Sequence, residues 1–133
     1  MNSKKVFFVF LSLFFVFVLA GCGAQNSNEG NNAEAVQDNS PIVFFYGEEC
    51  PHCKIVEEYF SENNIAEKIQ FSQKEVYHNK GNASFLAEKA KDCGISESEL
   101  GVPLLWNEGE CYIGDVDIIQ FFEQKVNNEN NQK

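Results

Sequence analysis

The sequence contains no arginine, and its 10 basic residues, all lysines, stand against 20 aspartates and glutamates. The formal net charge is therefore -10 at pH 7. Nucleic acids and anionic membrane surfaces are bound chiefly through lysine and arginine side chains that neutralise phosphates. The charge balance therefore argues against a nucleic-acid partner, and an acidic surface of this kind commonly serves solubility.

The sequence also lacks an apolar run of about 20 residues, the length that an ordinary transmembrane helix needs. The apolar run over residues 6–19 is shorter, and it follows Lys4 and Lys5. A positive segment, an apolar segment of this length and small residues after it are typical of a secretory signal. We therefore expect this segment to direct the chain out of the cytoplasm.

The four residues that end this run, Leu19, Ala20, Gly21 and Cys22, resemble the lipobox of bacterial lipoproteins. In that family the cysteine is lipidated on sulfur and becomes the first residue of the mature chain. The resemblance implies that residues 1–21 are a lipoprotein signal peptide and that Cys22 carries a diacylglyceryl group. An uncleaved signal anchor and a plain secreted protein are the alternatives. The expected location is extracytoplasmic, lipid-anchored to the bacterial cell membrane.

The chain after the signal is polar. Residues 23–40 are rich in Asn, Gln and Glu and contain one branched aliphatic residue, Val36. Such a segment cannot form a core, so residues 22–40 are expected to be the lipidated cysteine and a flexible linker. By the same reasoning residues 127–133 are expected to be a disordered tail. The folded domain is therefore expected over residues 41–126, long enough for a modest core.

The domain opens with a run of strand-forming residues. Residues 42–46, IVFFY, are apolar on both faces, which predicts a buried central strand ended by Gly47. Apolar residues between 55 and 60 then recur at helical spacing, which predicts a helix that closes at residues 63–64. A second strand is predicted over residues 68–77.

The second half of the domain continues the alternation. A second helix is predicted over residues 82–93, followed by a β-hairpin of residues 103–106 and 111–113. Asp115 is the predicted N-cap of a last helix. The apolar face of that helix is expected to consist of Val116, Ile119, Phe122 and Val126. The resulting order is β-α-β-α-β-β-α.

The motif Cys50-Pro51-His52-Cys53 lies between the first strand and the first helix. With this motif in this position, the chain resembles the thioredoxin superfamily, at about the size of a glutaredoxin. The dipeptide Pro51-His52 is similar to that of the periplasmic disulfide-oxidase (DsbA-like) branch. The resemblance implies an α/β, thioredoxin-like fold with a central mixed four-stranded sheet flanked by helices.

The segment Gly101-Val102-Pro103 matches the place where this superfamily has a cis proline. The resemblance implies a cis bond before Pro103. It also implies that the backbone of Val102 lies beside the reactive disulfide, where it can pair with an extended substrate chain. A trans proline in a plain turn is the alternative, because proline is ordinary at the first residue of a strand.

The spacing of the two cysteines suits redox exchange. A cysteine at a helix N-terminus faces the positive end of the helix dipole, which favours thiolate. A cysteine three residues later lies on the same face and can close a disulfide. We therefore expect Cys50 to be the exposed attacking thiolate and Cys53 to be the more buried resolving thiol.

Neighbouring charges act on this thiolate in opposite directions. His52 is expected to stabilise it by a hydrogen bond or a positive charge. Glu48 and Glu49 lie just upstream, and nearby carboxylates disfavour a thiolate. Either influence could prevail, so the redox direction of the pair is not decided at this stage.

Two other roles for the motif are less favoured. A structural zinc site needs four ligands, usually with a second close pair, and Cys93 and Cys111 stand far apart in the sequence. A purely structural Cys50–Cys53 bridge would close a loop too short to stabilise the fold much. We therefore expect no resident metal at this motif.

The remaining pair, Cys93 and Cys111, is expected to form a structural disulfide, as is usual in small domains of oxidising compartments. An electron relay to the Cys50/Cys53 pair and two free buried thiols are the alternatives.

The chain departs from two branches of the superfamily. Phe44 stands where thioredoxins have a buried aspartate. Gly114-Asp115 stands where glutathione-binding glutaredoxins have a glycine pair, which argues against glutathione use, although Asp117 could mimic part of that site.

These observations together favour an enzyme, an extracytoplasmic, membrane-tethered thiol-disulfide oxidoreductase that acts through the Cys50/Cys53 pair. No cofactor is expected beyond that redox-active disulfide. The expected partners are exported proteins with cysteines and a membrane redox protein that recycles the pair, and the chain is expected to be a monomer. The alternative is a lipoprotein of the same fold that binds or delivers a soft metal such as Cu(I) through the same cysteines.

Overall fold

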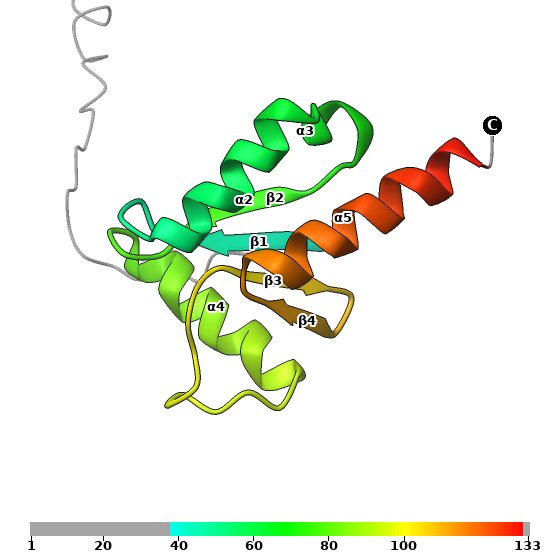
Figure 1. The fold of residues 1–133 in the computed structure, drawn as a ribbon. Helices are drawn as coiled ribbons and strands as arrows, with labels where there is room; N and C mark the ends of the chain where they lie inside the picture. The colour runs from blue at the N-terminus through cyan, green and yellow to red at the C-terminus, as the bar shows by residue number, and fades with distance from the viewer. Residues whose placement is uncertain (1–37, 132–133) are drawn as a thin grey trace, which may run out of the picture. The chain divides into compact units, whose positions relative to one another are not determined.

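A computed structural model describes residues 38–131, in which strands and helices alternate around one sheet (Figure 1). The elements are β1 (Ile42–Tyr46), α2 (Pro51–Glu62), α3 (Ile65–Lys68), β2 (Ser72–Glu75), α4 (Lys80–Asp92), β3 (Leu104–Asn107), β4 (Glu110–Ile113) and α5 (Asp115–Asn130). The predicted signal peptide, the lipidation site Cys22 and most of the linker lie outside the described residues. Within residues 38–131, no helix has the length and apolar character to cross a membrane.

The four strands form one mixed sheet in the order β2-β1-β3-β4. β1 is parallel to β2 and antiparallel to β3, and β3 and β4 form an antiparallel hairpin. In Figure 1, α2, α3 and α5 lie on one side of the sheet and α4 lies on the other. The predicted α/β class, with a thioredoxin-like sheet flanked by helices, is confirmed.

β1 is buried on both faces because its side chains alternate between two core clusters. Ile42 and Phe44 belong to the cluster beneath α2 and α5, and Val43 and Phe45 belong to the cluster beneath α4. The first cluster also contains Val56, Phe60, Ile65, Ile69, Leu105, Ile118 and Phe122, and the second contains Phe85, Leu86 and Leu104. Each fully buried side chain of this size contributes about 1.5 to 3 kcal/mol through lost contact with water.

The second predicted strand is shorter than expected. Residues 68–77 were expected to be extended, but β2 spans Ser72–Glu75 and the short helix α3 precedes it. β2 is an edge strand that pairs only with β1, from Val43↔Ser72 to Tyr46↔Glu75. Residues beyond this register have no strand partner, so they leave the sheet.

The last helix differs from its prediction in three respects. Its N-cap is Gly114 rather than Asp115, which is the first helical residue. The predicted apolar face is rotated, because Ile118 is buried and Val116 is 71% exposed. The helix also continues to Asn130, beyond the predicted domain end at residue 126. Adding residues to an existing helix is easy, since each one gains a hydrogen bond without a new nucleus.

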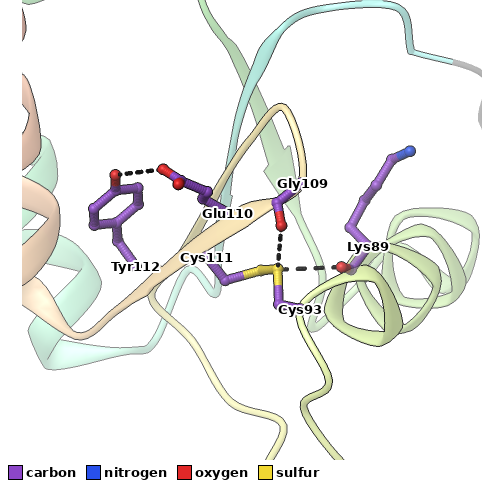
Figure 2. Close-up of a disulfide and its surroundings, with 6 residues drawn as sticks. All are labelled: Lys89, Cys93, Gly109, Glu110, Cys111 and Tyr112. Atoms are coloured by element: carbon purple, nitrogen blue, oxygen red, sulfur yellow. Dashed lines mark hydrogen bonds between the residues drawn. A yellow bond between two sulfur atoms is a disulfide. The ribbon is translucent and has the colours of Figure 1, made fainter.

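A disulfide joins Cys93, the C-cap of α4, to Cys111 in β4 (Figure 2). Their Cα atoms are 5.9 Å apart, within the usual range for a disulfide. The carbonyl oxygens of Gly109 and Lys89 lie 3.6 and 3.9 Å from the sulfurs of Cys93 and Cys111. A bridged sulfur carries no proton, so these are packing contacts. The bridge fastens the end of α4 to the outer strand of the hairpin.

Replacing Cys93 and Cys111 with alanine should lower the free energy of unfolding by about 3 kcal/mol, because the bridge restrains the unfolded chain over a loop of this length. The sequence separation of the two cysteines is 18 residues. Urea unfolding followed by circular dichroism measures the change, with both proteins carrying Cys50→Ala and Cys53→Ala so that only this bridge differs. A loss below about 0.5 kcal/mol would contradict a stabilising role.

Candidate functional site

The cysteine motif lies where β1 ends and α2 begins. The backbone N–H of Cys50 donates a hydrogen bond to the carbonyl of Gly47 at 3.0 Å, which closes a turn after the strand. Cys50 is the N-cap of α2, and Pro51 is the first residue of the helix. Proline suits this position because the first N–H groups of a helix have no intrahelical acceptor. Cys50 therefore lies at a helix N-terminus, the placement that favours thiolate.

The sulfur of Cys50 lies between two backbone groups. It accepts a hydrogen bond from the N–H of Cys53 at 3.3 Å, and it lies 3.5 Å from the carbonyl oxygen of Val102. Only 6% of Cys50 is exposed, so the expectation of an exposed thiolate is wrong. The reason is that the turn and the segment before β3 enclose the sulfur from two sides.

Cys53 is fully buried beneath Cys50, as the sequence predicted for the second cysteine. Burial raises the pKa of the Cys53 thiol to about 12, with further contributions from the Cys50 side chain and the Glu57 carboxylate. A hydrogen bond with the backbone of Gly47 opposes this rise. Both cysteines are free thiols in the structure. The two sulfurs are thus unequal, and Cys53 holds its proton at neutral pH.

The peptide bond between Val102 and Pro103 is cis. Pro103 is buried just before β3, and its carbonyl accepts a hydrogen bond from the N–H of Gly114 at 3.0 Å. This contact ties the segment before β3 to the start of α5. The carbonyl of Val102 thereby faces the sulfur of Cys50 at the distance given above, the placement that the family resemblance implied.

His52 does not serve Cys50 in the expected way. Its ring is largely exposed, and its Nδ1 lies 3.1 Å from a carboxylate oxygen of Asp115. The hydrogen bonds described for the Cys50 sulfur do not include the imidazole. The side chain of the second residue of α2 reaches across to the first residue of α5. The His52–Asp115 contact therefore joins two helix N-termini.

One of the two glutamates before Cys50 has a partner that the sequence analysis did not consider. Glu49 contacts Nε2 of His78 at 2.7 Å, and this hydrogen bond and charge raise the pKa of His78. A protonated His78 offsets part of the negative charge expected to oppose a thiolate. Glu48, Glu49 and His78 are also the one group of three potential metal ligands among residues 38–131, and neither reactive cysteine belongs to it.

The disulfide of Cys93 and Cys111 is far from the reactive pair along the sheet. Cys111 pairs with Trp106 of β3, and Trp106 pairs with Val43 near the start of β1. The motif follows the other end of β1, and the bridge is two strands away. The described structure therefore does not support the electron-relay alternative.

Two residues at the site were not identified from the sequence as functional. Asp115 was predicted only as a helix cap, and Tyr77 only as part of a strand. Tyr77 follows the carboxyl end of β2, which lies parallel to β1. Sites of α/β sheets form outside the carboxyl ends of parallel strands, so this position was the available signal.

Comparison with protein-family models gives no match, and comparison with curated protein sequences gives none either. Among solved structures, wheat glutaredoxin is similar with a TM-score of 0.46 and 21% identity, over 66% of this chain and 75% of that one. The holo form of glutaredoxin C1 from Populus tremula x tremuloides gives 0.45 and 15%, over 65% and 71%. A buckwheat glutaredoxin–glutathione complex gives 0.45 and 15%, over 65% and 72%. Because these TM-scores are below 0.5, we base the fold assignment on the order and directions of the strands and not on these similarities.

The inequality of the two thiols predicts selective alkylation. When the reduced protein is treated briefly with iodoacetamide at pH 7, Cys50 should be labelled about tenfold or more faster than Cys53, because only thiolate reacts. Peptide mapping by mass spectrometry measures both sites. Labelling in urea is the control, since unfolding should remove the difference. Equal rates in the folded protein would contradict the assignment.

Proposed function

We propose that this chain is an extracytoplasmic, membrane-tethered thiol-disulfide oxidoreductase that exchanges disulfides with exported proteins through Cys50 and Cys53. The observation that carries the proposal is the unequal cysteine pair at the N-terminus of α2. One sulfur is held at the helix terminus beside the carbonyl of Val102, and the other is buried with its pKa raised.

The proposed exchange proceeds in two steps. The Cys50 thiolate attacks one sulfur of a substrate disulfide, forms a mixed disulfide and releases the other substrate sulfur as a thiolate, which takes a proton from water. Cys53 then gives up its proton and attacks the Cys50 sulfur, and the second substrate sulfur leaves as a thiolate that takes up a proton. The substrate gains two electrons and two protons, and the cysteine pair becomes a disulfide. The reverse sequence oxidises a substrate dithiol.

The environment of Cys53 suits its role in the second step. Besides burial, the side chain and charge of Cys50 raise the pKa of Cys53 in the reduced protein. Once Cys50 is part of a mixed disulfide, it carries no charge. That contribution to the pKa of Cys53 then disappears, which favours deprotonation at the stage when Cys53 must attack.

The segment around the cis bond suits a polypeptide substrate. Val102 precedes β3 and has no strand partner in the register of the sheet. An extended substrate chain that lies across the start of β3 would find backbone groups of Val102 next to the reacting sulfur. Pro103 fixes the direction of those groups.

The location and recycling of the enzyme complete the proposal. Lipidation at Cys22 would hold the domain at the outer side of the membrane, and a membrane redox protein would return the pair to its active state. The direction of net transfer follows from the potential of the pair relative to its partners. Pro51-His52 resembles the oxidase branch, but His52 contacts Asp115 rather than Cys50, so the proposal covers oxidation, isomerisation and reduction alike.

Trapping tests the proposed activity. A Cys53→Ala variant should accumulate mixed disulfides between Cys50 and exported proteins, because the resolving thiol is missing. Non-reducing electrophoresis followed by mass spectrometry of the adducts measures this. The matched control is Cys50→Ala, which keeps the other cysteine and should form none. Absence of adducts from the Cys53→Ala protein, together with tight Cu(I) binding by the wild type, would favour the metal-binding alternative instead.

Mass spectrometry of the membrane fraction tests the tether. The mature protein should begin at Cys22 and carry a diacylglyceryl group on its sulfur. A Cys22→Ala variant should lack the diacylglyceryl group. An unmodified N-terminus at Met1 in the wild type would rule out the lipoprotein assignment without affecting the redox proposal.

A further inference from the structure

Tyr77 lies beside the reactive turn because β1 and β2 are parallel. Glu75, the last residue of β2, pairs with Tyr46, the last residue of β1, and the N–H of Val76 donates to the Tyr46 carbonyl at 2.9 Å. Tyr77 follows Val76, and Gly47 follows Tyr46, so these two residues are neighbours across the ends of the two strands. A Cβ added at Gly47 would overlap the Tyr77 ring. The absence of a side chain at residue 47 is what lets the aromatic ring rest on the turn.

The loop that carries Tyr77 is fastened to the turn by several polar contacts. The Glu75 carboxylate accepts hydrogen bonds from the N–H groups of Tyr77 at 2.7 Å and His78 at 2.9 Å. Desolvation raises the pKa of Glu75. These two hydrogen bonds and one from the Glu48 backbone outweigh that effect, so the pKa of Glu75 lies below its usual value. The Glu49–His78 contact holds the loop from the other side. The position of the Tyr77 ring is thus determined although the residue is 54% exposed.

The Tyr77 ring lies against Gly47, whose carbonyl accepts the hydrogen bond from the N–H of Cys50. Partial desolvation raises the pKa of Tyr77, and the charges of Cys50, Cys53 and Glu49 and a hydrogen bond with the Cys50 side chain raise it further. The phenol therefore keeps its proton and is available as a donor. In the sheet order β2-β1-β3, Tyr77 follows β2 and Val102 precedes β3, on opposite sides of β1.

We propose that Tyr77 is a further catalytic residue of this site: its hydroxyl donates a hydrogen bond to the Cys50 sulfur, and its ring, resting on Gly47, forms the wall opposite Val102. This inference rests on the proposed function. The phenol keeps its proton through the exchange, and the electrons move only between sulfurs. A donor that stabilises the Cys50 thiolate stabilises the reduced pair and makes its disulfide more oxidising.

The substitution Tyr77→Phe separates the hydroxyl from the ring, because phenylalanine keeps the packing on Gly47. The rate of Cys50 alkylation in the reduced Tyr77→Phe protein should fall about tenfold at pH 6 to 7, the effect of one hydrogen bond to a charged group. The difference should vanish at high pH, where the thiol is ionised without help. The redox equilibrium with glutathione should shift about tenfold toward the oxidised pair.

The titratable groups that surround the Cys50 sulfur are the same in both proteins, so the comparison isolates the hydroxyl. These groups are Cys53, His52 and Glu57 of α2, Glu48 and Glu49 of the turn, Glu75 and His78 at the end of β2, and Asp115 of α5. The matched control is Tyr112→Phe, which removes a hydroxyl that contacts Glu110 at 3.2 Å on the other edge of the sheet. That control should leave the alkylation profile unchanged.

Two results would overturn the inference. One is an alkylation profile of Tyr77→Phe that coincides with the wild type at every pH. The other is an equal loss in Tyr112→Phe, which would indicate a general change in the fold. Alkylation needs no protein substrate, so a failure of the trapping experiment would count against the proposed function and leave the result on Tyr77 standing.

Discussion

The burial of β1 on both faces of the sheet is the constraint on which the reactive site depends. A strand with apolar side chains on both sides cannot slip by one residue without exchanging its two buried faces. The pairing of Tyr46 with Glu75 and of Phe45 with Leu104 therefore places the end of β1 at one level in the sheet. The turn that carries Cys50 starts from this end of β1. The residues that flank the turn come from the neighbouring ends of β2 and β3.

The charge that surrounds the Cys50 sulfur depends on which charged side chains form ion pairs, and not only on how many there are. His52 is paired with Asp115, and Glu49 is paired with His78, so two of the charges near the motif have opposite partners. The polar groups that contact the Cys50 sulfur are instead two backbone groups, the N–H of Cys53 and the carbonyl of Val102. A sulfur stabilised by fixed dipoles responds less to salt than one stabilised by exposed ion pairs.

Local patterns made the central strand and the position of Cys50 and Cys53 at the start of a helix predictable, because each depends on residues close together in the sequence. The fold class followed from the resemblance that this motif carries. The placement of His52, Tyr77 and Asp115 was not predictable in this way. His52 meets a residue 63 positions away, and Tyr77 meets Gly47 only through the register of β2. The helix face of α5 was misplaced for a similar reason, since the core beneath it, rather than its own periodicity, selects Ile118.

The disulfide between α4 and β4 has a mechanical consequence for the reactive site. Cys93 and Cys111 close a covalent ring of the chain, and Val102 lies midway around it. The wall against which a substrate would be held is thus part of a ring whose two ends cannot separate. The Cys93–Cys111 bridge would in this way limit how far Val102 can move away from the Cys50 sulfur.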